Sequence, residues 1–508
     1  MRHDHPMKPD TPDACCCGPD VSSAPAQSRR ALLTASAGLA AGAAALPFLS
    51  DSARAQATGA NADGLLARMR GQRRILLKGG VVLTLDRGIG DFAQADVLIE
   101  DGKIREVRPS VALSNDDAAV IDATNRIVVP GFIDTHHHFY QGLLRSILTN
   151  GLLNPDYSRD IGNTLTPAYA PADAYAGVLV TALGMIDMGT TTAVDTSQVS
   201  HTPEHSDACI RALQESGMRA VYAYWRGSGP DMRYPQDIMR LQRTYFSSQD
   251  QLLTLALGAV LDTNVFTYAR EVGVRCVSHG VSNNTERTLL ELGRAGLLRP
   301  GDEYIHCTHL SDTAWRLLKA TGARISIAAP IEMAMGHGLP PIQAALDHGI
   351  RPSLSSDVDA TMAQDPFTIM RAAFTLQRLM LLQRARGGEQ NLPPLLTCRD
   401  VLEFATIEGA RATGLDKKVG TLAPGKRADI ILVDLDDISL IPSADPIATV
   451  VLRAHAGNVS WVFVGGRAKK RAGKLVDVDI RRVRSLVESS HAYLLKLARD
   501  AGVDIRRG

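Results

Sequence analysis

Short apolar runs alternate with amphipathic helical patterns through the middle of the chain. Strands that alternate with helices predict parallel βα units, and eight such units predict a closed barrel. The eight runs comprise residues 127–133, 191–194, 219–224, 253–259, 274–278, 304–306, 323–328 and 353–355. The predicted fold class is therefore α/β, with a TIM-type (β/α)8 barrel over residues 131–416.

Both ends of the chain carry a different pattern, in which short apolar strands meet at tight turns. Asp101-Gly102 and Gly465-Gly466 can adopt the positive φ angles of such turns. Strand groups on either side of a helix-rich middle predict one small domain assembled from both ends. We expect a composite β-sandwich from residues 74–130 and 417–475, and an amphipathic C-terminal helix within residues 476–508.

Composition limits the kind of partner. The chain has 508 residues, of which 45% are hydrophobic, and 55 basic side chains oppose 54 acidic ones. Such a chain is too apolar for disorder and long enough for a barrel plus a small domain. A net charge of +1 gives no electrostatic basis for binding nucleic acid. We expect a small-molecule substrate that is uncharged or weakly charged; a homo-oligomer is left open.

The first 55 residues predict a targeting segment. Arg29-Arg30 precede an Ala- and Gly-rich apolar run that ends in Ala53-Arg54-Ala55. This pattern resembles a twin-arginine export signal cleaved before Gln56, and it predicts a periplasmic protein with no stable membrane association after cleavage. The alternative is a transmembrane anchor, which an Ala- and Gly-rich run of marginal length does not favour. Cys15, Cys16 and Cys17 would leave with the signal, although three adjacent thiols could also bind metal.

The stretch Pro130-Gly131-Phe132-Ile133-Asp134-Thr135-His136-His137-His138 ends the first predicted barrel strand. Side chains two apart on a strand share a face, so His136 and His138 can converge while His137 faces away. Two neutral imidazoles form half of a tetrahedral or five-coordinate metal site. The alternative interpretation is a histidine-rich surface turn.

Other polar residues follow the later strands. His279 follows the fifth predicted strand, His306 and His309 follow the sixth, and Asp357 follows the eighth. Each alone could be a rim residue bonded to a carbonyl, or a helix cap in the case of Asp357. Together they occupy the end of the barrel where such folds place their chemistry.

These residues carry a family resemblance. From about residue 75 to about residue 474, the chain resembles the metal-dependent amidohydrolase superfamily, in the aminohydrolase and chlorohydrolase branch of cytosine deaminase, guanine deaminase and atrazine chlorohydrolase. Further matches are Ile305-His306-Cys307, Leu354-Ser355-Ser356-Asp357, and the segments 409–414 and 420–429.

The resemblance implies one divalent ion ligated by His136, His138, His279 and Asp357. Three imidazoles and a carboxylate suit Zn²⁺ first and Fe²⁺ second. The ion would activate water, Asp357 would accept the water proton, and His306 would polarise the scissile centre. The fourth strand run contains no lysine that could become a carboxylated bridge, which favours a mononuclear site.

One departure affects the reaction. Deaminases of this branch commonly carry Glu three residues after the fifth-strand His, where this chain has Ser282, which cannot shuttle a proton at neutral pH. The loop after the seventh strand offers Glu332 and His337 at the barrel mouth; alternatively, this is a Met-lined packing loop with a solvated glutamate. Gln141, Trp225 and His309 complete the predicted substrate contacts.

The predicted function is metal-dependent hydrolysis of a non-peptide carbon–nitrogen bond in a small cyclic amine, imine or amide-like substrate. Two alternatives stand beside it. One is a hydrolase that expels halide, alkoxide or alkylamine, for which the missing glutamate matters less. The other is a catalytically silent member that binds metal or ligand, which a complete ligand set does not favour.

Overall fold

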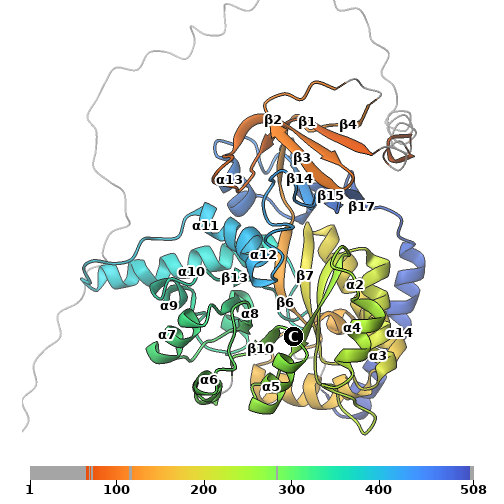
Figure 1. Cartoon of the computed structure of the whole chain (residues 1–508), viewed down its shortest axis with the longest axis vertical. Helices are drawn as coiled ribbons and strands as arrows, with labels where there is room; N and C mark the ends of the chain where they lie inside the picture. Colours follow the sequence, from red (N-terminus) through yellow and green to blue (C-terminus); the bar gives the residue numbers. More distant parts are fainter. Residues whose placement is uncertain (1–63, 68, 70–72, 114–116, 282–283, 504–508) are drawn as a thin grey trace, which may run out of the picture. The chain divides into compact units, whose positions relative to one another are not determined.

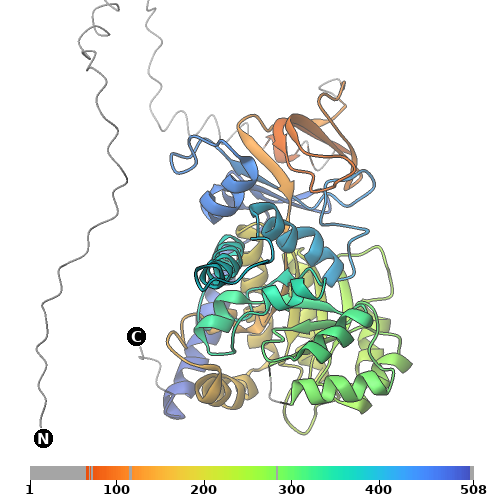
Figure 2. The same ribbon diagram turned by 90° about the vertical axis from the view of Figure 1, so that its left-hand side faces the viewer.

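The computed structural model describes residues 64–503 except 68, 70–72, 114–116 and 282–283. The predicted export signal lies outside these residues. Two sheets organise the described chain (Figures 1 and 2): an eight-stranded parallel sheet from its middle and a nine-stranded mixed sheet from its two ends. Among the described residues, no single helix is long and apolar enough to cross a membrane. Leu153–Ala168 and Pro171–Asp187, which meet at a sharp bend, reach that length and apolar character only in combination.

The eight-stranded sheet is the predicted (β/α)8 barrel, which is confirmed. Its strands follow each other in chain order around the sheet. They are β6 (Phe132–His137), β7 (Thr190–Ser197), β8 (Arg219–Tyr224), β9 (Leu253–Gly258), β10 (Cys276–His279), β11 (Glu303–Ile305), β12 (Arg324–Ile327) and β13 (Ser353–Leu354). The barrel closes just beyond β13, where His137 and Asp357 form an isolated parallel bridge.

Helices pack around the barrel strands (Figure 1), and the last two also pack against residues of the barrel interior. In chain order they are η1 (Phe139–Leu143), η2 (Leu153–Leu165), η3 (Thr166–Ala168), α2 (Pro171–Asp187), α3 (Pro203–Ser216), α4 (Ile238–Tyr245), α5 (Thr263–Glu271), α6 (Thr285–Arg294), α7 (Asp312–Ala320), α8 (Ala329–Ala334), α9 (Ile342–Asp347), α10 (Pro366–Arg386), α11 (Cys398–Glu403), η4 (Phe404–Glu408) and α12 (Gly409–Ala412). Ile407 and Ala410 of the last two pack with Ile133 and Val221 from the strands. This apolar plug fills the barrel interior, so the chemistry is left to the opposite end.

The second sheet is built from both chain ends, as predicted. It runs β17-β16-β15-β14-β5-β1-β2-β3, with β4 paired to β1. The strands are β1 (Arg74–Val82), β2 (Phe92–Glu100), β3 (Lys103–Arg108), β4 (Ala119–Asp122), β5 (Arg126–Pro130), β14 (Ile430–Asp434), β15 (Val459–Val464), β16 (Arg467–Arg471) and β17 (Lys474–Leu475). Apolar side chains from both ends, such as Ile75 and Leu432, share one core. Both predicted turns, Asp101-Gly102 and Gly465-Gly466, have positive φ angles.

The apolar run 127–133, predicted as one strand, is divided between the two sheets. β5 ends at Pro130 in the mixed sheet and β6 begins at Phe132 in the barrel. Gly131 makes the crossing possible, because a Cβ there would lie 2.2 Å from the Thr191 side chain. Apolar patterning alone does not distinguish one long strand from two buried strands in different sheets.

The rest of the C-terminal region is helical. α13 (Pro446–Ala448), η5 (Thr449–Arg453) and η6 (Ala456–Asn458) lie between β14 and β15, and α14 (Ile480–Asp500) follows β17. α14 packs against α2, η1 and η2. Its His491 Nδ1 lies 2.6 Å from the carbonyl oxygen of Leu143. The C-terminal helix therefore supports two segments, η1 and η2, that follow the first barrel strand.

Candidate metal centre and active site

The backbone brings the first and last barrel strands together at the candidate site. The amide of His138 donates to the carbonyl of Asp357 over 2.9 Å, and the amide of Asp357 donates to the carbonyl of His136 over 3.0 Å. Asp357 has a φ of +64°, in the left-handed region that non-glycine residues rarely adopt. A conformation of that kind persists only where neighbouring contacts hold it.

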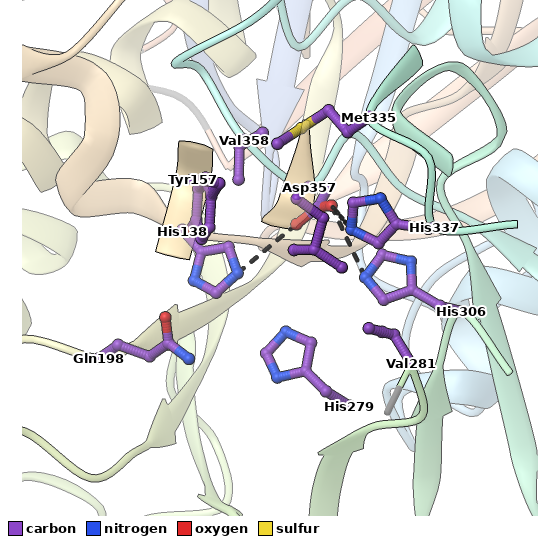
Figure 3. Close-up of a pocket in the computed structure, with 11 residues that line it drawn as sticks. His138, Tyr157, Gln198, His279, Val281, His306, Met335, His337, Asp357 and Val358 are labelled. Atoms are coloured by element: carbon purple, nitrogen blue, oxygen red, sulfur yellow. Dashed lines mark ion pairs between the residues drawn. The ribbon is translucent and has the colours of Figure 1, made fainter. Parts of the chain in front are cut away.

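Four side chains from three strand ends converge there, and Figure 3 shows three of them, those of His138, His279 and Asp357. Asp357 Oδ1 lies 2.9 Å from His136 Nε2 and 3.5 Å from His138 Nε2. His279 Nε2 is 3.3 Å from His136 Nε2. Within each of the triads His136/His138/His279 and His136/His306/Asp357, the potential ligand atoms all lie within 4.8 Å of one another. Residues separated by more than 200 positions therefore present their donor atoms to one small volume.

Protonation states in this cluster suit a cation. Burial lowers the pKa of His136, His138 and His279, so each imidazole favours its neutral form. Burial alone would raise the pKa of Asp357, but the nearby charge of His306 and the hydrogen bond with His136 hold it well below its usual range. Neutral imidazoles and an ionised carboxylate are the forms that ligate metals.

Neighbouring groups orient these donors. His136 Nδ1 lies 2.9 Å from the Thr196 hydroxyl at the end of β7, which leaves Nε2 directed at the cluster. Such a bond orients the ring of a ligating histidine. The residues present therefore fit a divalent ion held by His136, His138, His279 and Asp357.

The fourth strand contributes no ligand to this cluster. β9 ends in Gly258, and a Cβ at that position would lie 2.2 Å from the indole of Trp225. The Trp225 ring in turn packs 4.7 Å from the ring of His279. An aromatic side chain thus occupies the space beside the strand end from which a bridging lysine would have to reach.

His306 and Glu332 form a buried pair beside the donors. His306 Nε2 lies 3.6 Å from Asp357 Oδ2, while its Nδ1 lies 3.0 Å from Glu332 Oε1. The same Glu332 oxygen accepts the amide of Ala328 over 2.9 Å. Burial alone would lower the pKa of His306, but the charges of Asp357 and Glu332 raise it above its ordinary value.

This geometry corrects the prediction that Glu332 contacts substrate. Glu332 is fully buried on α8 and does not line the pocket, and it is not solvated either. Its carboxylate lies behind His306, away from Asp357. The apolar loop sequence around Glu332 gave no indication that the side chain would turn inward to meet a histidine 26 residues earlier.

A cavity of about 170 Å³ opens over the cluster. Apolar side chains form much of its wall. The polar groups in the wall come from Tyr157, Gln198 and His337, together with His138, His279, His306 and Asp357. The lining residues are His138, Leu153, Tyr157, Gln198, His279, Val281, His306, Met335, His337, Asp357 and Val358. Concave, largely apolar sites with a few polar groups are typical of small-molecule binding.

Of the other predicted substrate contacts, the structure places some at the cavity and others away from it. His337 reaches the cavity, with Nε2 4.0 Å from Asp357 Oδ2. Gln141 is buried and donates to the Tyr157 hydroxyl over 2.6 Å, so it positions a lining residue rather than forming the wall itself. Trp225 lies beside His279 and lines an adjoining hollow. His309 is exposed and lies outside the cavity, because its ring packs beside Gly338.

Sequence reasoning missed Gln198, Tyr157 and Leu153. Gln198 directly follows β7, which is longer than the predicted run 191–194, so the strand-end rule could have found it if that strand had been extended through its polar end. Tyr157 and Leu153 belong to η2, between the first two barrel strands. No motif or periodicity marks that segment as part of the cavity.

Comparison with known protein families gives a match over more than half of the chain. The model of the amidohydrolase family matches residues 127–239 and 270–469, which include every proposed metal ligand. The chain belongs to the amidohydrolase family. This membership, with the histidine-rich cluster, indicates a divalent-metal hydrolase. The relatives described next support its action on carbon–nitrogen bonds of small cyclic substrates.

Relatives with assigned activities cover most of the chain. A 5'-deoxyadenosine deaminase of Methanothermobacter thermautotrophicus is 29% identical over 437 residues, which are 80% of this chain and 96% of that protein. A 5-methylthioadenosine/S-adenosylhomocysteine deaminase of Caldicellulosiruptor saccharolyticus is 24% identical over 450 residues, covering 81% and 97%.

Solved structures share the fold. An adenosine deaminase from Xanthomonas campestris with bound zinc superposes with a TM-score of 0.73 at 19% identity, covering 83% of this chain and 98% of that one. A mutant atrazine chlorohydrolase TrzN from Arthrobacter aurescens, complexed with zinc and atraton, gives 0.72 at 22% identity, covering 82% and 100%. At these identities the likeness establishes the architecture.

Proposed function

We propose that this amidohydrolase is a mononuclear zinc enzyme that removes an amine by hydrolysis from a ring carbon of a nitrogen heterocycle, with adenine nucleosides as the first substrate class to test. The observation that carries the proposal is the convergence of His136, His138, His279 and Asp357 at one wall of a cavity, with the buried His306–Glu332 pair beside them. The names of the two deaminase relatives support the choice of substrate class.

The proposed ion would act as the Lewis acid that makes water nucleophilic at neutral pH. Asp357 is ionised and lies within the donor cluster, so its Oδ2 can accept the proton lost by the attacking water. His306 Nε2 faces the same oxygen at 3.6 Å and can stabilise the charge that develops on the ring or return a proton to the leaving amine. Glu332 holds the opposite ring nitrogen and keeps His306 in that orientation.

The cavity wall supports a flat, partly apolar substrate. Leu153, Met335 and Val358 offer apolar contact, while Gln198 and the Tyr157 hydroxyl offer hydrogen bonds to ring nitrogens or substituents. Figure 3 shows the Gln198 amide directed toward the space between His138 and His279. An amide that both donates and accepts suits the edge of a heterocycle.

A second function follows from Ser282, because serine is a poor proton shuttle for an amine leaving group. Expulsion of halide, which leaves without protonation, depends less on such a shuttle. The second candidate is therefore hydrolytic displacement of halide from a heterocycle, and by extension of alkoxide or alkylamine, whose departure would need a proton from His306. A silent member is the third, and a complete, correctly protonated donor set disfavours it.

The test is a panel assay of purified protein loaded with zinc. Adenosine, 5'-deoxyadenosine, cytosine and guanine are supplied as amines, and a chlorinated and an alkylamino triazine as the alternatives. Ammonia release from a nucleoside supports deamination, and chloride or alkylamine release alone supports the second function. Asp357→Asn is the matched control. The absence of zinc-dependent turnover on every compound would contradict both.

We also propose export to the periplasm by the twin-arginine route. The support is the pair Arg29-Arg30 ahead of an Ala- and Gly-rich run with an Ala-x-Ala end. That route carries folded proteins, which suits a chain whose metal site joins the first and last strands of a barrel.

A further inference from the structure

His137 occupies a special position between two proposed ligands. Its backbone pairs with Asp357 in the bridge that closes the barrel. Its side chain points away from the metal cluster, is fully buried, and lies against the segment that carries Asp357. The mechanism above makes no use of this third histidine.

The imidazole of His137 contacts that segment on both sides of Asp357. Nδ1 lies 2.8 Å from the hydroxyl oxygen of Ser356, the residue before Asp357. Nε2 makes no hydrogen bond among the described residues, but it lies within ion-pair distance of Asp359, 3.8 Å from Oδ2, two residues after Asp357. Asp359 is held in turn by the Thr181 hydroxyl at 3.2 Å and by Arg145 Nε at 3.4 Å.

Asp134 completes the arrangement from the middle of β6. Its carboxylate accepts the Ser356 hydroxyl and also the backbone amides of Ser356, at 3.3 Å, and His136, at 3.1 Å. Because the Ser356 hydroxyl gives its only proton to Asp134, His137 Nδ1 must donate to the Ser356 oxygen. The hydrogen-bond directions are thus fixed along the line from Asp134 through Ser356 to His137.

We propose that His137 is a positioning residue for the metal site. Its hydrogen bond with Ser356 and its ion-pair contact with Asp359 hold the chain on both sides of Asp357 and keep that residue in its left-handed conformation, so that the carboxylate faces the three ligating imidazoles. The inference rests on the proposed metal site. A φ of +64° at an aspartate is a strained conformation that needs surrounding contacts to persist. Loss of these two interactions would let Asp357 relax away from the other ligands.

The consequence is a specific effect on metal affinity. Residues that hold metal ligands in position without binding the metal themselves typically contribute about 10–100-fold to the metal affinity. His137→Leu removes both contacts and keeps an apolar side chain of moderate size in the buried site. Ser356→Ala breaks the same line at its centre with the loss of a single oxygen atom, and Asp134 keeps the backbone amides of His136 and Ser356 as donors. His205→Gln is the matched control, because His205 is a buried histidine bonded to the Tyr169 carbonyl, away from the cluster.

The experiment measures the zinc dissociation constant of the full chain by competition with a chromogenic chelator, and the circular dichroism and melting of each apo protein. We expect zinc to bind about 10–100-fold more weakly to H137L, about tenfold more weakly to S356A, and with unchanged affinity to H205Q. If S356A and every folded H137L preparation bind zinc within twofold of wild type, the inference is overturned. If the wild-type protein itself binds no zinc, the proposed metal site fails first, so the two failures are distinguishable.

Discussion

Replacing Glu332 with glutamine tests how the buried pair acts. The substitution keeps an oxygen that can accept from His306 Nδ1 and from the Ala328 amide, and it removes the negative charge. Since Glu332 is buried and does not line the cavity, substrate should bind as before. The His306 imidazole, which faces Asp357 across 3.6 Å, should lose the charge that fixes its proton on Nδ1.

The magnitude follows from the kind of bond that is lost. A hydrogen bond to a charged group contributes about 1.5–3 kcal/mol, against about 0.5–1.5 kcal/mol for a neutral one. The difference, about 1–1.5 kcal/mol, corresponds to roughly a tenfold fall in kcat. Glu332→Ala leaves two donors without a partner and should cost more, about 10²-fold or above.

The assay is steady-state turnover of the best substrate from the panel, with zinc content and melting temperature measured for each variant. We expect kcat to fall about tenfold in E332Q while KM and zinc content stay within about twofold of wild type. A large rise in KM with kcat unchanged would make Glu332 a substrate contact and refute the positioning role. A collapse of kcat by 10³-fold or more would instead make Glu332 an obligatory proton carrier.

Three further predictions address other parts of the chain. His306→Asn and Asp357→Asn should each lower kcat by about 10²–10⁴-fold with zinc in excess, as single-turnover assays can measure; near-wild-type rates in either would remove that residue from the reaction. Glu303 is buried at the start of β11 with Arg275 Nη2 3.6 Å from its carboxylate, and burial raises its pKa to about 8 although the arginine charge opposes the shift, so the folded chain holds a proton that the unfolded chain releases above about pH 4.5. The free energy of unfolding of the wild-type protein should therefore fall as pH rises from about 5 to 8. Glu303→Gln resembles the protonated acid, so urea titrations should show it to be more stable than wild type by about 2–4 kcal/mol at pH 8 and equally stable near pH 5. A constant difference at both pH values would contradict this. Replacing Arg29 and Arg30 with lysine should trap the unprocessed precursor in the cytoplasm, whereas normal processing in fractionated cells would exclude the twin-arginine route.

Much of the barrel was predictable because its strands are short apolar runs with polar ends. The predicted run 219–224 has the same bounds as β8, and the strand-end rule led from sequence to His279, His306 and Asp357. These residues could be found because a parallel barrel collects all its strand ends on one face. The division of the run 127–133 between two sheets was not predictable, since both halves are equally apolar and only the packing of Gly131 on Thr191 separates them.

The chemical role of a site residue was harder to predict than its position at one end of the barrel. Glu332 and Gln141 follow strand ends, as substrate contacts do, but each turns its polar group toward another side chain, His306 or Tyr157. Sequence position determines which end of the barrel a residue reaches, whereas its rotamer depends on neighbours that are distant in the chain. The same reason explains why His137 could be assigned to the opposite face from His136 without any indication of the Ser356 and Asp359 contacts found there.

The most direct test of the account is the metal content of the mature protein. We predict one equivalent of zinc per chain in protein purified without chelators, measured by elemental mass spectrometry, and its loss in the double variant His136→Asn/His138→Asn with the fold retained by circular dichroism. Two equivalents per chain, or one equivalent that the double variant retains, would contradict the mononuclear site on which the proposed reaction depends.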